Sequence, residues 1–313
     1  MGKITVEVQV DKIFKHTRQG SYGTRARYKD SCHLFVRFCA ERFKMKNIRN
    51  LHDKHVLAFV QERQKAGIGA KTIKNDLTAL RYLHDQIQQP RYSLSDNKSL
   101  KEFYGVKLEK TSQVNGNRAW TEDEYQGIVR IAKELQQENI ADCLTLARTM
   151  GLRVTEAAAV SRAQAEYALR TGLYQVKGEA KNGKHREVRL SAAGKAIFER
   201  RLRYTERGNR LFIAPGEKTH QVVNRMEKFV QNHRDKVLTA QGAEQRIDKR
   251  DGTSRSLTFH GLRYSYVQER MQQEMAKGYS RDSAALIVSR EVGHERIDVI
   301  KIYEGVKKDV KKD

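Results

Sequence analysis

The sequence predicts a mainly α-helical protein with one small antiparallel β-sheet. Three observations lead to this fold class. The 313-residue chain has only two prolines, Pro90 and Pro215, so long helices can form along most of it. Apolar residues recur at helical spacing in most segments. The pair Asn182-Gly183, a strong signal for a tight turn, separates two short segments in which apolar and polar residues alternate.

The length of the chain favours two domains, each with its own core. Residues 105–118 are polar and lack periodicity, which is typical of a linker. We expect a helical first domain at 21–110, a linker at 111–118 and a second domain at 119–313. Residues 1–20 are expected to form an N-terminal arm or an extra strand, because the letters KITVEVQV alternate between apolar and polar.

The first domain is expected to be a small helical bundle. Its apolar residues lie three and four positions apart, as on the buried face of a helix. Gly67 and Gly69 end the second helix, and Pro90 follows the third. The expected helices cover residues 24–44, 53–66, 72–89 and 100–104.

The second domain opens with a capping box, Thr121 and Glu124, which predicts the start of a helix. A further helix ends at Gly151, and the hairpin around Asn182-Gly183 follows it. The polar and basic segment 239–256 is expected to be a mobile loop that orders on a ligand, or plain disorder. The remaining expected helices cover residues 192–204 and 219–237, one that opens at His260, 281–292, and a short last one that carries Tyr303.

The chain is strongly basic. Lysine and arginine number 61 against 38 acidic residues, a formal net charge of +23. Such an excess repels itself unless a polyanion compensates it. The basic residues are spread over both halves, so we expect a nucleic acid to contact both domains. A charged membrane surface is the weaker alternative, because no strongly apolar helix face is evident.

Cysteine usage and hydropathy indicate the compartment. Cys32, Cys39 and Cys143 show neither paired nor metal-ligand spacing, as expected of reduced thiols in a cytosolic protein. The start MGKITVEVQVDK has no apolar core of a signal peptide, and no run approaches about 18 apolar residues. We therefore expect a cytoplasmic protein with no membrane partner.

Five residues in three segments suggest a site for a phosphate diester. His260 and Arg263 lie one helical turn apart, so that their side chains share a face. Arg153 begins a turn upstream, and Tyr303 follows His294 by nine residues. Arginine forks onto phosphate oxygens, histidine moves protons, and tyrosine can act as a covalent nucleophile. Each feature alone is common, so the specificity lies in their order and spacing.

These motifs resemble a known family. GLRVTEA, a lysine-bearing hairpin, HGLRYSY and GHERIDVIKIYE follow one another as in the tyrosine recombinases of phages and conjugative elements. The resemblance covers most of residues 120–305. It implies that Arg153, Arg263, His260 and His294 surround the phosphate, and that Tyr303 attacks it. The hairpin lysine, aligned at Lys181 with Lys184 as the fallback, would protonate the leaving oxygen.

The resemblance also implies a reaction and an assembly. Such an enzyme cleaves and rejoins DNA through a 3′-phosphotyrosyl intermediate, with no metal or other cofactor. The first domain would be a core-binding (SAM-like) domain and the second the catalytic domain, together a C-shaped clamp on DNA. A homotetramer would join two duplexes in the bacterial cytosol, to move or resolve a mobile element. The residues expected to contact DNA from the third helix are Lys71, Lys74, Asn75 and Arg81.

The chain departs from the family pattern at one position, and three other functions are alternatives. Many family members have a further histidine after the arginine of His-x-x-Arg, where this chain has Tyr264. A type IB topoisomerase would use the same chemistry to relax supercoils. A catalytically inactive DNA-binding protein could keep the fold, although the complete residue set argues against it. A basic RNA-binding or ribosomal protein would not need this constellation.

Overall fold

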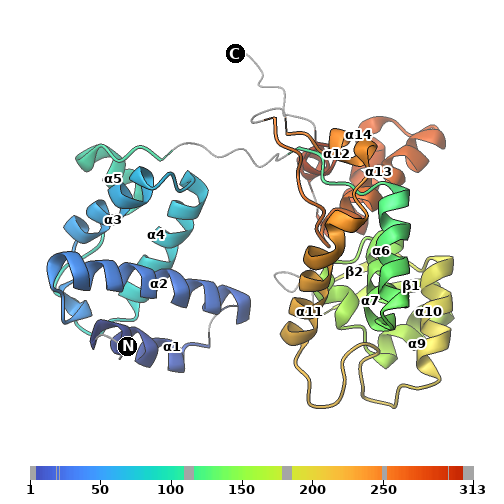
Figure 1. Ribbon diagram of the computed structural model, residues 1–313, viewed down its shortest axis with the longest axis horizontal. Helices are drawn as coiled ribbons and strands as arrows, with labels where there is room; N and C mark the ends of the chain where they lie inside the picture. Colours follow the sequence, from blue (N-terminus) through green and yellow to red (C-terminus); the bar gives the residue numbers. More distant parts are fainter. Residues whose placement is uncertain are drawn as a thin grey trace. The chain divides into compact units, whose positions relative to one another are not determined.

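The structure is a computed structural model of the chain. The structure describes residues 5–18, 20, 22–108, 116–177, 185–248, 252–294 and 296–305. It divides into two compact units, Met1–Ser112 and Gln113–Asp313, called unit one and unit two below. The predicted fold class, mainly α with a small antiparallel sheet, is confirmed (Figure 1).

Unit one is a bundle of helices around its own apolar core. The core includes Phe35, Phe59 and Leu80, which come from three different helices and are almost completely buried. Phe35 and Phe59 meet edge to face, with ring centroids 5.2 Å apart. The helices are α1 (Thr5–His16), α2 (Tyr22–Phe43), α3 (Asp53–Lys65), α4 (Ala70–Asp85) and α5 (Asn97–Tyr104), with a 3-10 turn at Ile48–Asn50.

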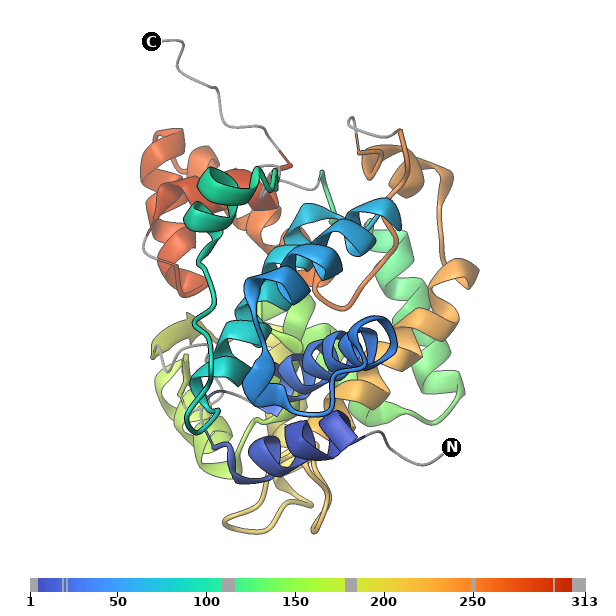
Figure 2. The same cartoon turned by 90° about the vertical axis from the view of Figure 1, so that its left-hand side faces the viewer.

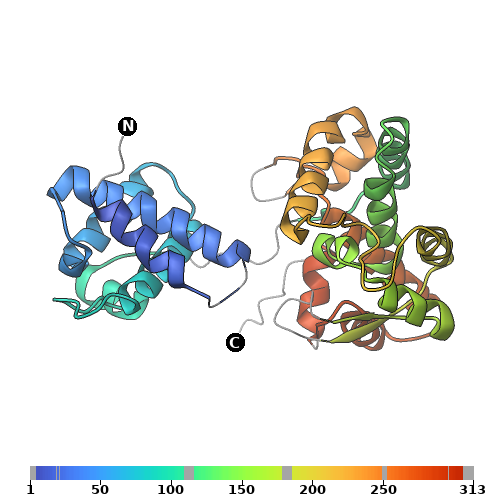
Figure 3. The ribbon, with the colours of Figure 1, turned by 90° about the horizontal axis from the view of Figure 1, so that it is seen from below.

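The expectation of an arm or strand at the N-terminus is wrong, because residues 5–16 form helix α1. Val6 and Val10 are buried one turn apart, and Phe14 packs against the same core one turn later. This spacing of four suits a helix, and it competes with the alternation of apolar and polar residues in the same letters. The helix lies along α2 (Figure 3). The buried carboxylate of Glu7 in α1 binds Arg37 Nη2 of α2 at 2.7 Å.

Unit two is a larger helical domain with one hairpin. The capping box is present: Thr121 accepts from the backbone of Glu124, whose side chain accepts from the backbone of Thr121. Gly151 ends α7 with φ 62°, as a left-handed cap. The helices before the last group are α6 (Glu122–Glu134), α7 (Glu138–Met150), α8 (Val154–Ala158), α9 (Arg162–Thr171), α10 (Ala192–Leu202), α11 (Thr219–His233) and α12 (Ala240–Gln245).

The hairpin consists of β1 (Leu173–Val176) and β2 (Arg186–Arg189), paired antiparallel. Tyr174 lies opposite Val188, and Val176 lies opposite Arg186. All four of these residues are on the buried face of the pair. In unit two, β1 packs beside α9 and β2 beside α14 (Arg281–Glu291), as Figure 3 shows.

The last helices form one group, drawn in orange to red in Figure 2. They are α13 (Gly261–Ala276), α14 and α15 (Ile300–Tyr303), with a 3-10 turn at Ile297–Val299 before α15. Val267, Val288 and Ile300, one from each helix, are completely buried together in a cluster of their own. The C-terminal tyrosine is thus carried on a short helix that packs on α13.

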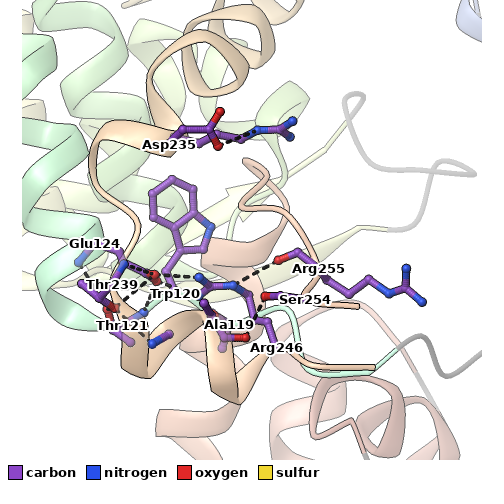
Figure 4. A network of polar contacts seen from close by, with 12 residues as sticks. Ala119, Trp120, Thr121, Glu124, Asp235, Thr239, Arg246, Ser254 and Arg255 are labelled. Carbon is purple, nitrogen blue, oxygen red and sulfur yellow. Dashed lines mark hydrogen bonds and ion pairs between the residues drawn. The ribbon is translucent and has the colours of Figure 1, made fainter. Parts of the chain in front are cut away.

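The segment 239–256 is not a mobile loop over its described part, so that expectation is wrong. Residues 240–245 form α12, which Thr239 caps by accepting from the backbone of Gly242. Arg246 directly after it is completely buried. A buried charge needs a partner of opposite sign, and Glu124 supplies it with Nη2–Oε1 at 2.6 Å (Figure 4). The ion pair between Arg246 and Glu124 therefore anchors this polar segment to α6.

Candidate active site

Arg263 is the centre of the candidate active site. It lies in the first turn of α13 and is completely buried. Its guanidinium donates to three acceptors: the carbonyls of Gly151 and Val292, and the hydroxyl of Tyr303, with Nε–Oη at 3.2 Å. Burial, followed by the charges of neighbouring arginines, lowers the pKa of Arg263 to about 10. The side chain therefore remains a cation at neutral pH.

Gly151 is required for this arrangement. Its carbonyl reaches Arg263 from a left-handed conformation, which glycine adopts without strain. A Cβ at this position would lie 2.4 Å from the ring of Tyr266, so no other residue fits without displacing that ring. The glycine before Leu152-Arg153 thus brings the upstream motif against α13.

Tyr303 is almost completely buried, with 5% of its surface exposed. Its hydroxyl lies between Arg263 Nε and His294 Nε2, the latter 3.5 Å away. Its backbone carbonyl accepts from Gln268 Nε2 at 2.7 Å, which ties α15 to α13. Its ring meets that of Tyr264 edge to face, with centroids 4.8 Å apart. The predicted nucleophile is therefore held at the predicted arginine, with Tyr264 against its ring.

Two histidines flank the tyrosine. The ring centroids of His260 and His294 each lie 6.2 Å from that of Tyr303. Desolvation, followed by the positive charges of Arg263 and Arg153, lowers the pKa of both histidines to about 4. His260 is exposed at the surface. Both imidazoles are therefore neutral at pH 7 and can each accept a proton or a hydrogen bond.

Arg153 joins the site through a buried carboxylate. It caps α8, and its Nη1 lies 2.7 Å from Glu156 Oε1. The same carboxylate accepts hydrogen bonds from both terminal nitrogens of Arg186, at 2.8 and 2.6 Å. Burial alone would raise the pKa of Glu156, but Arg186, Arg153 and Arg263 lower it to about 2. The pair of Arg153 and Glu156 is therefore part of a buried cluster.

The cluster carries an excess of positive charge beside the tyrosine. Three guanidinium groups (Arg153, Arg186 and Arg263) act on the one carboxylate of Glu156. Arg153 uses one side-chain nitrogen in its observed hydrogen bond to Glu156, so several of its five N–H groups are left for a ligand. Charge-assisted pairs of this kind are strongest with carboxylate or phosphate. The site is therefore suited to a phosphate group next to a tyrosine hydroxyl.

The two candidate lysines, Lys181 and Lys184, lie outside the described residues. The strand that follows them begins with Arg186, whose Nε donates to the carbonyl of Glu291 at 3.0 Å. The root of the hairpin is therefore bonded both to Glu156 and to Glu291 at the end of α14, two residues before Gly293. The assignment of a lysine as general acid stays a prediction.

Arg186 was not among the residues predicted from sequence, although a signal for it exists. It stands two positions before Val188, on the face of β2 that packs inward. An arginine at an inward position needs a buried carboxylate. Gln268, which binds the backbone of Tyr303, has no comparable signal in the sequence, because it depends on how α15 packs on α13.

The expected DNA contacts of unit one lie on α4. Lys71, Lys74 and Asn75 are spaced three and four positions apart in its first turns, so they share a face. Lys71 is exposed, and the other two are half-buried. Arg81 differs, because its guanidinium binds the carbonyl of Ser95 at 2.9 Å and the side chain of Asn97. These bonds hold the loop before α5, and a DNA contact by Arg81 stays a prediction.

Comparisons with known proteins bear on the fold. A family model described as phage integrase, N-terminal, matches residues 1–89. A search of curated protein sequences found no match. Among solved structures, the integrase of the transposon Tn1549 in complex with a circular intermediate DNA is 13% identical, with a TM-score of 0.58, over 96% of this chain and 95% of that one.

Two structures of lambda integrase are also similar. A dimer bound to a COC′ core site is 14% identical, with a TM-score of 0.62, over 98% of this chain and 96% of that one. A tetramer bound to a Holliday junction is 15% identical, with a TM-score of 0.58, over 98% and 80%. The resemblance that the motifs indicate is confirmed, and the chain has the tyrosine recombinase fold. No described helix is long and apolar enough to cross a membrane.

Proposed function

We propose that this chain is a site-specific DNA recombinase that cleaves and rejoins strands through a 3′-phosphotyrosyl intermediate. The observation that supports this most is the position of the Tyr303 hydroxyl, 3.2 Å from buried Arg263 and 3.5 Å from His294. A buried tyrosine that only fills a core has no need of a cation and a neutral imidazole at its oxygen. A nucleophile that attacks a phosphate needs both.

In the cleavage step, the Tyr303 oxygen bonds to phosphorus and the bond from phosphorus to the 5′-oxygen breaks. The tyrosine proton passes to a neutral imidazole, for which His294 lies closest among the described residues. Charge on the non-bridging oxygens is stabilised by Arg153 and Arg263, with His260 at the exposed side. The 5′-oxygen leaves with a proton from Lys181, or from Lys184 in the alternative assignment.

The same step in reverse rejoins DNA. The phosphotyrosyl ester conserves the energy of the broken bond, so the 5′-hydroxyl of a second strand can attack it and release Tyr303. Exchange between two duplexes requires one active site for each strand. We therefore propose a homotetramer on two double-stranded DNA sites, by analogy with the lambda integrase tetramer bound to a Holliday junction.

Both units take part in DNA binding in this proposal. Unit one presents the basic face of Lys71, Lys74 and Asn75, and unit two presents the arginine cluster at Tyr303. The net charge of +23 supports a polyanionic partner. The substrate is then a recombination site of a mobile element, which the enzyme moves or resolves.

The test begins with duplexes that the protein selects from a random library. Each selected duplex is nicked beside the cleavage position, so that the released fragment diffuses away and the covalent adduct accumulates. Plasmids with two copies of the sequence then report exchange. The proposal predicts an adduct and exchange between paired copies. Relaxation of any supercoiled plasmid without exchange would indicate a topoisomerase, and binding without an adduct would indicate an inactive DNA-binding protein.

A further inference from the structure

The segment that leads into α6 passes directly beside the candidate active site. Asn117 Oδ1 accepts from Gln268 Nε2 at 2.8 Å, and Gln268 also binds the carbonyl of Tyr303. Two residues later, the carbonyl of Ala119 accepts from buried Arg246 Nη1 at 3.1 Å, as Figure 4 shows. The backbone is therefore fixed on both sides of the residue between them, Arg118.

Further contacts fix this segment against α13. The backbone N–H of Trp120 donates to Ser265 Oγ at 2.8 Å, and its indole donates to the carbonyl of Thr258 at 2.9 Å. The carbonyl of Arg118 lies so close to Gly261 that a Cβ there would be 2.5 Å from it. Arg118 thus sits at the start of α13, the helix that presents His260 and Arg263.

The side chain of Arg118 is held differently from the other arginines of the site. Its Nε is buried and has no hydrogen-bond partner among the described residues. Arg263 binds carbonyls, and Arg153 and Arg186 bind Glu156. An unpaired buried donor is unfavourable, so this guanidinium gains stability from an acceptor.

The charge of Arg118 also acts on the site. It lowers the pKa of His260, after desolvation and the charges of Arg263 and Arg153. It opposes the desolvation that raises the pKa of Tyr264, whose ring lies against Tyr303. The positive charge of Arg118 therefore acts on both Tyr264 and His260, which is exposed.

We propose that Arg118 is a further substrate-binding residue that donates to a phosphodiester of the DNA at the point of Tyr303 attack, either the scissile phosphate or its immediate neighbour. This rests on the proposed function. A phosphate oxygen is the acceptor that a fixed arginine beside a cationic centre selects. The hydrogen bonds from Gln268 to Asn117 and to Tyr303 would then align this phosphate contact with the nucleophile.

The test compares wild type, Arg118→Ala and Arg207→Ala on nicked duplexes. Arg207 is an exposed arginine after α10, so its variant controls for the loss of one positive charge. Each substrate is native, or carries one neutral methylphosphonate at the scissile phosphate or at either neighbour. We expect Arg118→Ala to slow adduct formation roughly 10²-fold on native DNA, while Arg207→Ala does not.

At one of the three neutral positions the difference between Arg118→Ala and wild type should almost vanish, because the phosphate charge that Arg118 binds is absent. That position identifies the phosphate. The proposal is overturned if Arg118→Ala forms the adduct on native DNA as fast as wild type does. It is also overturned if the slower rate of Arg118→Ala relative to wild type is the same at all three neutral positions as on native DNA.

A binding measurement separates this inference from the recombinase proposal. The slope of log affinity against log salt should become shallower by about one unit in Arg118→Ala, whether or not wild type cleaves. If wild type forms no adduct but the slope changes, the recombinase proposal fails and the phosphate contact stands. An unchanged slope with an unchanged melting temperature overturns the phosphate contact.

Discussion

The Nε of Arg263 lies 3.2 Å from the hydroxyl oxygen of Tyr303 and donates a hydrogen bond to it. The two residues are forty positions apart in the sequence and come from the first turn of α13 and the last residue of α15. The tyrosine oxygen is thus docked at a cation before any DNA is bound. Changes to this pair and to the residues that support it should have measurable consequences.

The histidines predict a pH dependence of stability. The pKa of His260 and of His294 is lowered from 6.5 to about 4 in the folded state. Between these values the unfolded chain binds more protons than the folded one, so the free energy of unfolding falls as the pH drops from 6.5 toward 4. Urea unfolding of wild type and His294→Gln at several pH values measures this. The variant should show the shallower slope, and identical slopes would contradict the assignment.

The buried pair of Arg246 and Glu124 predicts a large loss of stability. Both side chains are completely inaccessible, and Arg246 also binds the carbonyl of Ala119 (Figure 4). Arg246→Ala leaves a buried carboxylate unpaired, which costs about 3–5 kcal/mol. Arg130→Ala is the matched control, because Arg130 and Glu134 form an exposed pair worth about 0–1 kcal/mol. Chemical unfolding followed by circular dichroism compares them, and equal losses would show that the pair does not anchor the segment.

Glu156 predicts a defect in cleavage that exceeds the defect in binding. Glu156→Gln removes the charge that holds both Arg153 and Arg186, so the arginine geometry at Tyr303 loosens. We expect adduct formation to fall by at least 10²-fold while duplex affinity stays near that of wild type. Glu187→Gln controls for charge, because Glu187 is exposed on β2, the strand that carries Arg186. A normal rate of adduct formation in Glu156→Gln would show that Arg153 needs no such support.

The hairpin lysine predicts a chemical rescue. If Lys181 protonates the leaving oxygen, Lys181→Ala should slow cleavage roughly 10²–10⁴-fold. A bridging sulfur in place of the 5′-oxygen needs no proton, so this substrate should restore the variant but not Arg153→Ala. Rescue of Lys184→Ala in place of Lys181→Ala would exchange the two assignments. Rescue of neither would move the proton donor to another residue, with His260 tested next.

Local patterns in the sequence predict much of the fold. The capping box at Thr121 and Glu124 and the glycine stop at Gly151 depend on neighbours in the chain, and the structure has both. The first helix escapes prediction because its valines alternate, and only packing on α2 distinguishes a helix from a strand there. The polar segment 239–256 hides an anchor because the partner of Arg246 lies 122 residues away.

The residues of the candidate site likewise fall into those that the sequence predicts and those that it does not. Order and spacing predict Arg153, His260, Arg263, His294 and Tyr303, and the structure brings them together around Tyr303. Arg186 and Gln268 act through contacts between distant segments, so spacing alone does not reveal them.

The central claim is that Tyr303 forms the covalent bond to DNA. The most direct measurement incubates wild type and Tyr303→Phe with the same nicked duplex, digests the DNA, and identifies the modified peptide by mass spectrometry. We predict that wild type carries a nucleotide on Tyr303, while Tyr303→Phe binds the duplex equally well and forms no adduct. An adduct in Tyr303→Phe, or a nucleotide on Tyr264 or another residue of wild type, would contradict this claim.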